Sequence, residues 1–183
     1  MTRRAAVLAP GYGGTERQPI LLALGDALAR FDIGSRAVRF STRGARPSPH
    51  YARELDDLRV ARDALRQDGF ERIALVGRSF GGRMSAFLAA QEPPDALAIL
   101  GHPIAPPGRA RPEDEAALGG IACPTLVVQG SSDELGPLAV LERLAAANPH
   151  IDIVRIDGAG HDFGPHERGA VDAAARWLDA VLR

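Results

Sequence analysis

The chain has 183 residues, and its 22 basic residues, all of them arginine, nearly balance 23 acidic residues to give a net charge of −1. Because lysine is absent, the protein cannot form a lysine Schiff base, attach pyridoxal phosphate or supply a P-loop lysine. The near-neutral charge argues against nucleic-acid binding, and the single cysteine excludes an internal disulfide and a multi-cysteine zinc site. We therefore expect no metal, no other cofactor and no nucleic-acid partner.

Length and hydropathy favour one globular domain in the cytoplasm. A composition of 45% hydrophobic and 25% charged residues is typical of globular proteins. The apolar segment Ala5–Ala9 is too short for the hydrophobic region of a signal peptide. Nothing in the sequence approaches the roughly 18 apolar residues that a membrane span needs. We predict a single cytoplasmic domain over residues 1–183 that does not contact a membrane.

Six short apolar segments recur along the chain at intervals that each leave room for a helix. The central segments are apolar throughout, which is typical of parallel strands covered on both faces. This alternation predicts a doubly wound α/β sheet of six mostly parallel strands with right-handed crossovers. If the second strand lies outside the first, the strand order becomes 2-1-3-4-5-6. The predicted strands are Ala5–Ala9, Arg36–Phe40, Ile73–Val76, Leu97–Leu100, Thr125–Gln129 and Ile151–Ile156.

Apolar residues at helical spacing lie in three of the intervals between these strands. One interval differs, because Gly101–Gly120 contains four prolines and reads as a long irregular connection. A connection of about 20 residues is unusual in a compact domain and favours a functional loop. The helical stripes are Tyr51, Leu55, Leu58 and Leu65, then Leu138, Leu141 and Leu144, then Val171, Leu178 and Val181.

A candidate nucleophile follows the third predicted strand. Gly77-Arg78-Ser79-Phe80-Gly81 matches the pattern Gly-x-Ser-x-Gly between a strand and a helix. In such a tight turn, side chains at either glycine would collide with the neighbouring strand and helix. The serine hydroxyl then projects above the sheet, at a helix N-terminus that favours developing negative charge. The simpler alternative is a glycine-rich turn with an incidental serine.

A nucleophilic serine needs a base, and the base needs a carboxylate to orient it. Asp133 follows the fifth predicted strand and His161 follows the sixth, so both are expected at the edge of the sheet that carries Ser79. The order serine, acid, histidine is the one expected for this strand–turn–helix arrangement. Glu134 is the alternative acid. His102 follows the fourth strand and is a further candidate to line the site.

The loop after the first predicted strand, Pro10–Gly14, is rich in glycine. It does not fit the dinucleotide spacing Gly-x-Gly-x-x-Gly, because position 16 is a glutamate. We predict instead that the backbone N–H groups of Tyr12 and Phe80 form an oxyanion hole. A plain tight turn is the alternative. In the order 2-1-3-4-5-6, this loop and Ser79 flank the point where strand order reverses, the usual ligand site of such sheets.

Further substrate contacts are predicted from Gly11, Arg78 and His102, while Tyr12 and the segment Gly101–Gly120 are expected to shape the acyl pocket. Arg78, Arg109 and Arg111 could attract an anionic substrate. Solvated surface arginines are the plainer interpretation of all three in a chain so rich in arginine.

Together these residues resemble the α/β-hydrolase fold over nearly the whole chain. The segments 77–83, 101–108, 128–133 and 158–161 are similar to a small branch that groups the third subunit of the NSL acetyltransferase complex with testis-expressed-protein-like hydrolases, near the dienelactone hydrolases. The resemblance implies a Ser79–Asp133–His161 triad, a Tyr12/Phe80 oxyanion hole and no cap domain. The chain departs from many members in having Pro10-Gly11 where they have His-Gly, and in starting at what would be their third strand.

The leading hypothesis is a capless serine hydrolase that cleaves an ester or related acyl compound of small size through an acyl-enzyme. Two alternatives remain open at this point: a non-catalytic interaction module with the same fold, and an acyltransferase that uses the same triad. The exposed edges of a six-stranded sheet could also pair with a second copy of the chain to form a homodimer.

Overall fold

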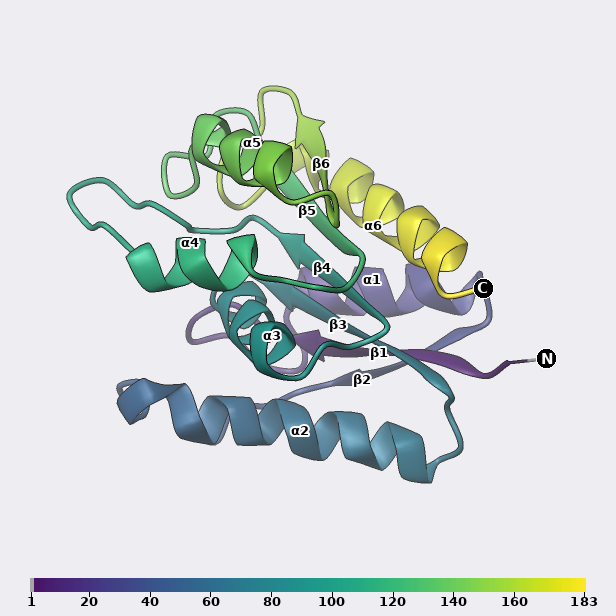
Figure 1. Cartoon of the computed structure of the whole chain (residues 1–183). Coiled ribbons are helices and arrows are strands. Elements are labelled where there is room, and N and C mark those ends of the chain that lie inside the picture. The colour runs from purple at the N-terminus through teal and green to yellow at the C-terminus, as the bar shows by residue number, and fades with distance from the viewer. Residues whose placement is uncertain (1) are drawn as a thin grey trace.

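The computed structural model describes residues 2–183 as a six-stranded sheet with helices on both faces (Figure 1). All five strand pairs are parallel, and the order β2-β1-β3-β4-β5-β6 confirms the predicted doubly wound topology. Strand order reverses between β1 and β3, which places the carboxyl ends of these two strands at the expected ligand site. The strands are β1 (Arg4–Ala9), β2 (Ile33–Ala37), β3 (Arg72–Arg78), β4 (Ala96–Leu100), β5 (Thr125–Gly130) and β6 (Ile151–Ile156).

Two hydrophobic layers hold the helices against the sheet, because successive strand residues point to opposite faces. Along β1, Ala5 and Val7 face one layer while Ala6 and Leu8 face the other. Helices α2 (Ala52–Gln67), α3 (Phe80–Gln91), α4 (Pro112–Gly119) and α5 (Leu138–Ala147) cover the first face. Helices α1 (Pro19–Ala29) and α6 (Glu167–Val181) cover the second (Figure 1). No cap domain is inserted among the elements of residues 2–183.

The second strand lies three residues before its predicted position. The prediction Arg36–Phe40 relied on Val38 and Phe40, which are buried but follow the strand. β2 itself is an edge strand whose residues after Ile33 and Gly34 are exposed, so its own sequence carries little hydrophobic signal. Phe40 is buried because its ring packs edge-on against Phe80, with 5.6 Å between the ring centroids.

The segment Gly101–Gly120 is not irregular throughout, because its second half forms α4. Pro112 is one of the four prolines that predict an irregular segment, but it occupies the first turn of α4, where its missing N–H is tolerated. Three acidic residues follow it in that turn and favour the positive end of the helix dipole. The irregular part is therefore limited to residues 101–111.

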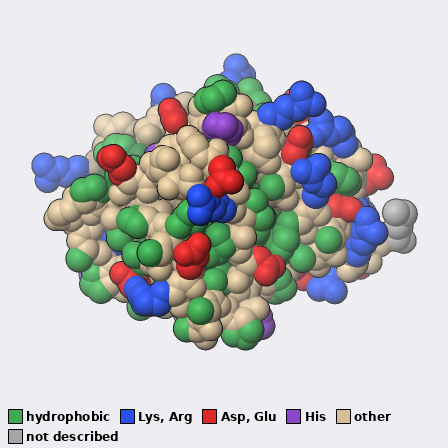
Figure 2. Space-filling view, turned by 90° about the horizontal axis from the view of Figure 1, so that it is seen from above, with side chains coloured by type: hydrophobic (Ala, Val, Ile, Leu, Met, Phe, Trp, Pro, Cys, Tyr) green, Lys and Arg blue, Asp and Glu red, His purple; other side chains and the backbone are tan. Residues whose placement is uncertain are grey.

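The outer surface carries charges of both signs. In the face shown in Figure 2, basic and acidic side chains are interspersed with apolar ones rather than gathered by sign. Within residues 2–183, every helix is too short or too polar to span a membrane.

One buried ion pair joins α3 to α4. Arg83 binds both carboxylate oxygens of Asp114, and the two side chains are only 9% and 1% exposed. Burial is the largest single influence and lowers the pKa of Arg83, but the hydrogen bonds to Asp114, the charge of Asp114 and the contact with Tyr51 together outweigh it, so that pKa is raised. Each charge depends on the other, because an unpaired buried charge is strongly destabilising.

We expect Asp114→Ala to lower the free energy of unfolding by roughly 3–5 kcal/mol, because it leaves the Arg83 guanidinium buried without its carboxylate. Urea denaturation measures this change. The neighbouring exposed residue supplies the control, since Glu113→Ala should change stability by less than about 0.5 kcal/mol. Equal effects of the two substitutions would show that the buried pair is not the cause.

Candidate active site

Ser79 lies in a strained turn between β3 and α3. Its φ of +50° and ψ of −111° are rare for a residue other than glycine. The backbone N–H of Ser79 donates to the carbonyl of Leu100 at 3.1 Å, which fixes the turn against β4. Such strain is typical of residues held in place for a function.

The two glycines of the motif are required by close backbone contacts. A Cβ atom at Gly77 would lie 2.3 Å from the backbone of Gly81 in α3. A Cβ atom at Gly81 would lie 2.3 Å from the carbonyl oxygen of Ala9 at the end of β1. These glycines therefore let α3 begin directly over β3 and beside the loop that follows β1.

The structure brings Ser79, His161 and Asp133 together in one hydrogen-bonded chain. Ser79 Oγ lies 2.8 Å from His161 Nε2, and His161 Nδ1 lies 2.8 Å from Asp133 Oδ2. With the imidazole proton assigned to Nδ1, His161 donates to the carboxylate and Nε2 accepts from the serine hydroxyl. Glu134, the alternative acid, is exposed and forms no hydrogen bond with His161.

Gln129 is a buried residue behind the acid that the sequence analysis did not single out. Its Nε2 donates to Asp133 Oδ2 at 2.7 Å and to the carbonyl of Gly136 at 2.9 Å. The backbone N–H of Leu135 donates to Asp133 Oδ1 at 2.9 Å. The sequence feature that could have indicated this role is a single amide residue near the carboxyl end of a buried and largely apolar strand, β5.

Arg78 lies beneath the histidine instead of in solvent. Its guanidinium donates to the carbonyl oxygens of His161 at 2.5 Å and of Leu100 at 3.3 Å, and lies 3.3 Å from His161 Nε2. Burial lowers the pKa of Arg78, and the attraction of Asp133 and nearby carboxylates offsets this only in part. The side chain is 8% exposed, so its contacts are with the protein.

Tyr12 and Phe80 lie next to each other across the loop after β1. Their rings meet edge to face at 5.8 Å, and neither backbone N–H has a hydrogen-bond partner among residues 2–183. The N–H of Gly11 is already used, because it donates to Gln18 Oε1 at 2.9 Å. Phe80 directly follows Ser79, and two free N–H donors are what an oxyanion hole would require.

His102 is completely buried, so its ring does not reach the surface of the site. Neither ring nitrogen has a hydrogen-bond partner in the described chain. Its backbone N–H donates to Gln129 Oε1 at 2.8 Å, which places it behind the acid. Burial lowers the pKa of His102 to about 4.

The fold and this serine-centred site define an α/β hydrolase class of protein. A family model described as alpha/beta hydrolase domain matches residues 2–182, so the chain belongs to that family. No curated protein matches the chain in sequence.

Solved structures share the fold at low sequence identity. Est1E from Butyrivibrio proteoclasticus is 16% identical with a TM-score of 0.82, covering 98% of this chain and 88% of Est1E. A dienelactone hydrolase from Anabaena variabilis is 21% identical with a TM-score of 0.81, covering 100% of this chain and 88% of the other. A serine hydrolase without lid from Xanthomonas campestris is 24% identical with a TM-score of 0.75, covering 97% and 83%. At these identities the three structures show that the chain shares their fold.

We expect His102 to make stability depend on pH. The unfolded chain takes up a proton here as pH falls through about 6.5, whereas the folded chain does so only near pH 4. The contribution of neutral His102 to the free energy of unfolding is therefore fully present above pH 6.5, and it falls by about 3 kcal/mol between pH 6.5 and pH 4. Denaturant titrations across this range should show a shallower pH slope for His102→Gln than for the wild type.

The exposed His150 supplies the control for this measurement. His150→Gln should retain the wild-type slope. An unchanged slope in His102→Gln would contradict the assignment.

Proposed function

We propose that the protein is a serine hydrolase that cleaves an ester or related acyl compound through an acyl-enzyme. The observation that carries the proposal is the hydrogen-bonded chain from Ser79 through His161 to Asp133, with Ser79 at a strained turn. The carboxylic-ester specificity, the small capless branch and the cytoplasmic location predicted from the sequence are parts of the same proposal. The dienelactone hydrolase and the serine hydrolase without lid support it as structural neighbours that are hydrolases by name.

The first half-reaction forms the acyl-enzyme. Ser79 Oγ attacks the carbonyl carbon while His161 Nε2 takes the hydroxyl proton. The carbonyl oxygen becomes an oxyanion that accepts hydrogen bonds from the N–H groups of Tyr12 and Phe80. When the tetrahedral intermediate collapses, the bond to the leaving group breaks, and His161 passes its proton to that group.

The second half-reaction repeats these steps with water. His161 takes a proton from the water, whose oxygen attacks the acyl carbon, and returns the proton to Ser79 Oγ as the acid departs. Asp133 stabilises the imidazolium that forms in both halves. Gln129 and the Leu135 N–H keep the carboxylate facing His161, because they bind the oxygens of Asp133 in fixed directions.

Arg78 is assigned a positioning role in this scheme, in place of a direct substrate contact. It precedes the nucleophile and binds the main chain of the base, so it ties the two catalytic loops together. The Arg78 guanidinium also lies over the Phe163 ring, with its central carbon 5.6 Å from the ring centroid, so Phe163 restrains it from another side. The planar fork of a guanidinium suits this arrangement, because separate nitrogens donate to the two carbonyl groups in fixed directions.

We expect a fluorophosphonate probe to label folded protein at Ser79, because the probe reacts with serines activated by a base. Ser79→Ala should abolish labelling and lower hydrolysis of short p-nitrophenyl esters by roughly 10,000-fold or more. Labelling is read by mass spectrometry, and Ser131→Ala, after β5, is the control that keeps labelling. A folded wild type that is neither labelled nor active would contradict catalysis and favour the interaction module.

We expect Arg78→Met to lower kcat about 10- to 100-fold with little change in KM, because the loss of charged hydrogen bonds leaves His161 poorly placed. Rates are referred to the fraction of active sites titrated by the fluorophosphonate, which removes the effect of misfolded protein. Added guanidinium ion should restore part of kcat. The exposed Arg176 is the control, and Arg176→Met should behave as wild type. A normal kcat per active site in Arg78→Met would contradict the role.

A further inference from the structure

Two neighbouring hollows lie on the side of Phe80 that faces Phe40 and Tyr51. A small hollow next to Phe80 is bounded by the loop after β1 and by Arg43. It adjoins a larger hollow of about 760 Å³, and Pro47 lines both. We call the two hollows together the arginine groove. Its larger part is lined chiefly by Arg46, Pro47, Tyr51, Arg83, Phe87 and Arg109.

The arginine groove carries an excess of positive charge. Arg43, Arg46 and Arg109 are exposed and form no ion pair among residues 2–183, and Arg83 alone is neutralised, by Asp114. Glu113 is the one carboxylate on the lining of the larger hollow. Unpaired arginines that line neighbouring hollows favour binding of an anion.

The pKa of Arg111 is affected by the same excess of positive charge. Burial lowers its pKa most, and repulsion from Arg83 and then Arg109 lowers it further, although Asp114 opposes this. Its guanidinium donates to the carbonyl of Pro103 at 2.7 Å, so Arg111 anchors the segment that presents Arg109. Arg109, two residues before Arg111, lines the larger hollow.

The floor of the arginine groove is aromatic. The rings of Tyr51 and Phe87 stack at 5.4 Å with an angle of 17°, and the Arg83 guanidinium lies over both. His50 and Tyr51 both have positive φ, at +52° and +55°, so the backbone is strained where it delivers the Tyr51 ring. Such a floor can bury an apolar chain between the reacting carbonyl and a distal charge.

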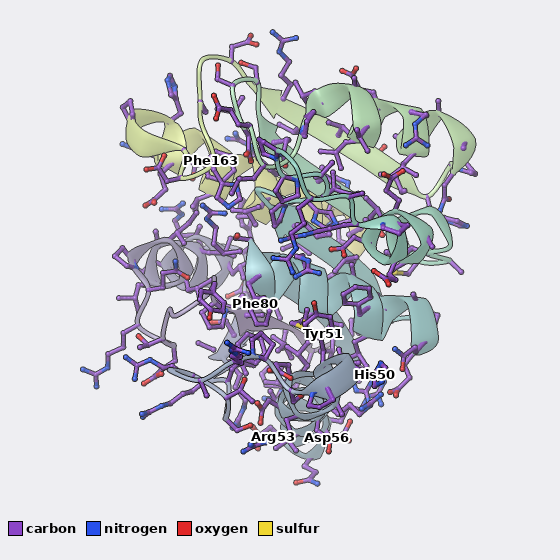
Figure 3. All side chains as sticks on the ribbon, turned by 90° about the vertical axis from the view of Figure 1, so that its left-hand side faces the viewer. His50, Tyr51, Arg53, Asp56, Phe80 and Phe163 are labelled. Atoms are coloured by element: carbon purple, nitrogen blue, oxygen red, sulfur yellow. The ribbon has the colours of Figure 1, made fainter. Side chains whose placement is uncertain are left out.

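The direction of the reaction decides which part of a substrate enters the groove. The leaving group must lie beside His161, because that residue protonates it. In Figure 3, Phe163, Phe80 and Tyr51 follow one another from the upper part of the site down toward His50. Tyr51 meets Phe80 edge to face at 6.3 Å, so the floor continues directly from the residue after the nucleophile. With the leaving group at His161, the acyl part of the substrate is left to extend past Phe80 toward the arginine groove.

We propose that the arginine groove binds a negatively charged group at the far end of the acyl chain. The substrate class is then an ester of a dicarboxylic acid, in which an apolar chain separates the reacting carbonyl from a free carboxylate. Arg46 and Arg109 bind the carboxylate, and the Tyr51–Phe87 floor contacts the chain. This inference rests on the proposed serine hydrolase function.

The experiment compares esters that differ only in the distal charge. Mono-p-nitrophenyl adipate and suberate carry a terminal carboxylate, and the matched esters carry a terminal carboxamide of nearly the same shape. We expect kcat/KM to be about tenfold higher for the carboxylate of the better-fitting chain length, as one charge-assisted hydrogen bond supplies. The preference should decrease with salt, because the arginines are exposed.

Variants test where the preference arises. Arg46→Gln combined with Arg109→Gln should bring the ratio of carboxylate to carboxamide rates close to one. Arg53 is exposed, lies on the same stretch of chain and does not line either hollow, so Arg53→Gln should keep the wild-type ratio. A third ester, with a neutral acyl chain and a carboxylate on the leaving phenol, should show no dependence on Arg46 and Arg109.

The outcomes separate this inference from the function on which it rests. If Ser79-dependent hydrolysis occurs without a carboxylate preference, or if the preference survives the double variant, the groove assignment is wrong and the hydrolase stands. If the preference follows the charge on the leaving phenol instead, the direction is wrong. If no ester is hydrolysed and Ser79 is not labelled, the proposed function itself has failed.

Discussion

A carbonyl of β4 and two glycine contacts hold Ser79 at a φ of +50°, a conformation that costs about 1–3 kcal/mol in a residue other than glycine. The packing at Gly77 and Gly81 offsets this cost. Because these two residues have no Cβ atom, α3 can begin directly against the backbone of β1 and β3. The same packing sets the Phe80 N–H beside the loop of Tyr12. The proposed nucleophile and the proposed oxyanion donors therefore depend on one steric constraint.

The use of arginine in place of lysine matters for the structure around this site. Arg78 donates to two carbonyl groups, and Arg83 binds both oxygens of Asp114 while its guanidinium lies over two aromatic rings, 5.4 Å and 5.7 Å from their centroids. A planar guanidinium with several donors in a fixed fork suits both arrangements better than the point charge of a lysine ammonium. Around this site arginine thus acts as a rigid connector of buried polar groups as well as a charge.

The parallel sheet and the candidate residues could be predicted because their signals are local. Ser79, Asp133 and His161 each follow an apolar strand, and parallel strands bring their carboxyl ends to one edge. The shifted β2 and the helix α4 could not be predicted so well, since an exposed edge strand carries little hydrophobic pattern and Pro112 suits both a loop and a helix start. The direction of a side chain is set by packing between distant segments. For this reason the burial of His102, the inward direction of the Arg78 side chain and the hydrogen bond from Gln129 to Asp133 could not be predicted from the sequence.

The ion pair that stabilises α4 also determines what the arginine groove can bind. Asp114 neutralises Arg83, whose guanidinium lies over the rings of Tyr51 and Phe87 as part of the floor. Unpaired charges remain on Arg46 and Arg109 at the larger hollow and on Arg43 at the small hollow next to Phe80. An acyl chain that crosses the aromatic floor would therefore bring its carboxylate to Arg46 and Arg109. Of these two, Arg109 depends on the contact between α3 and α4, because it lies in the segment that leads into α4.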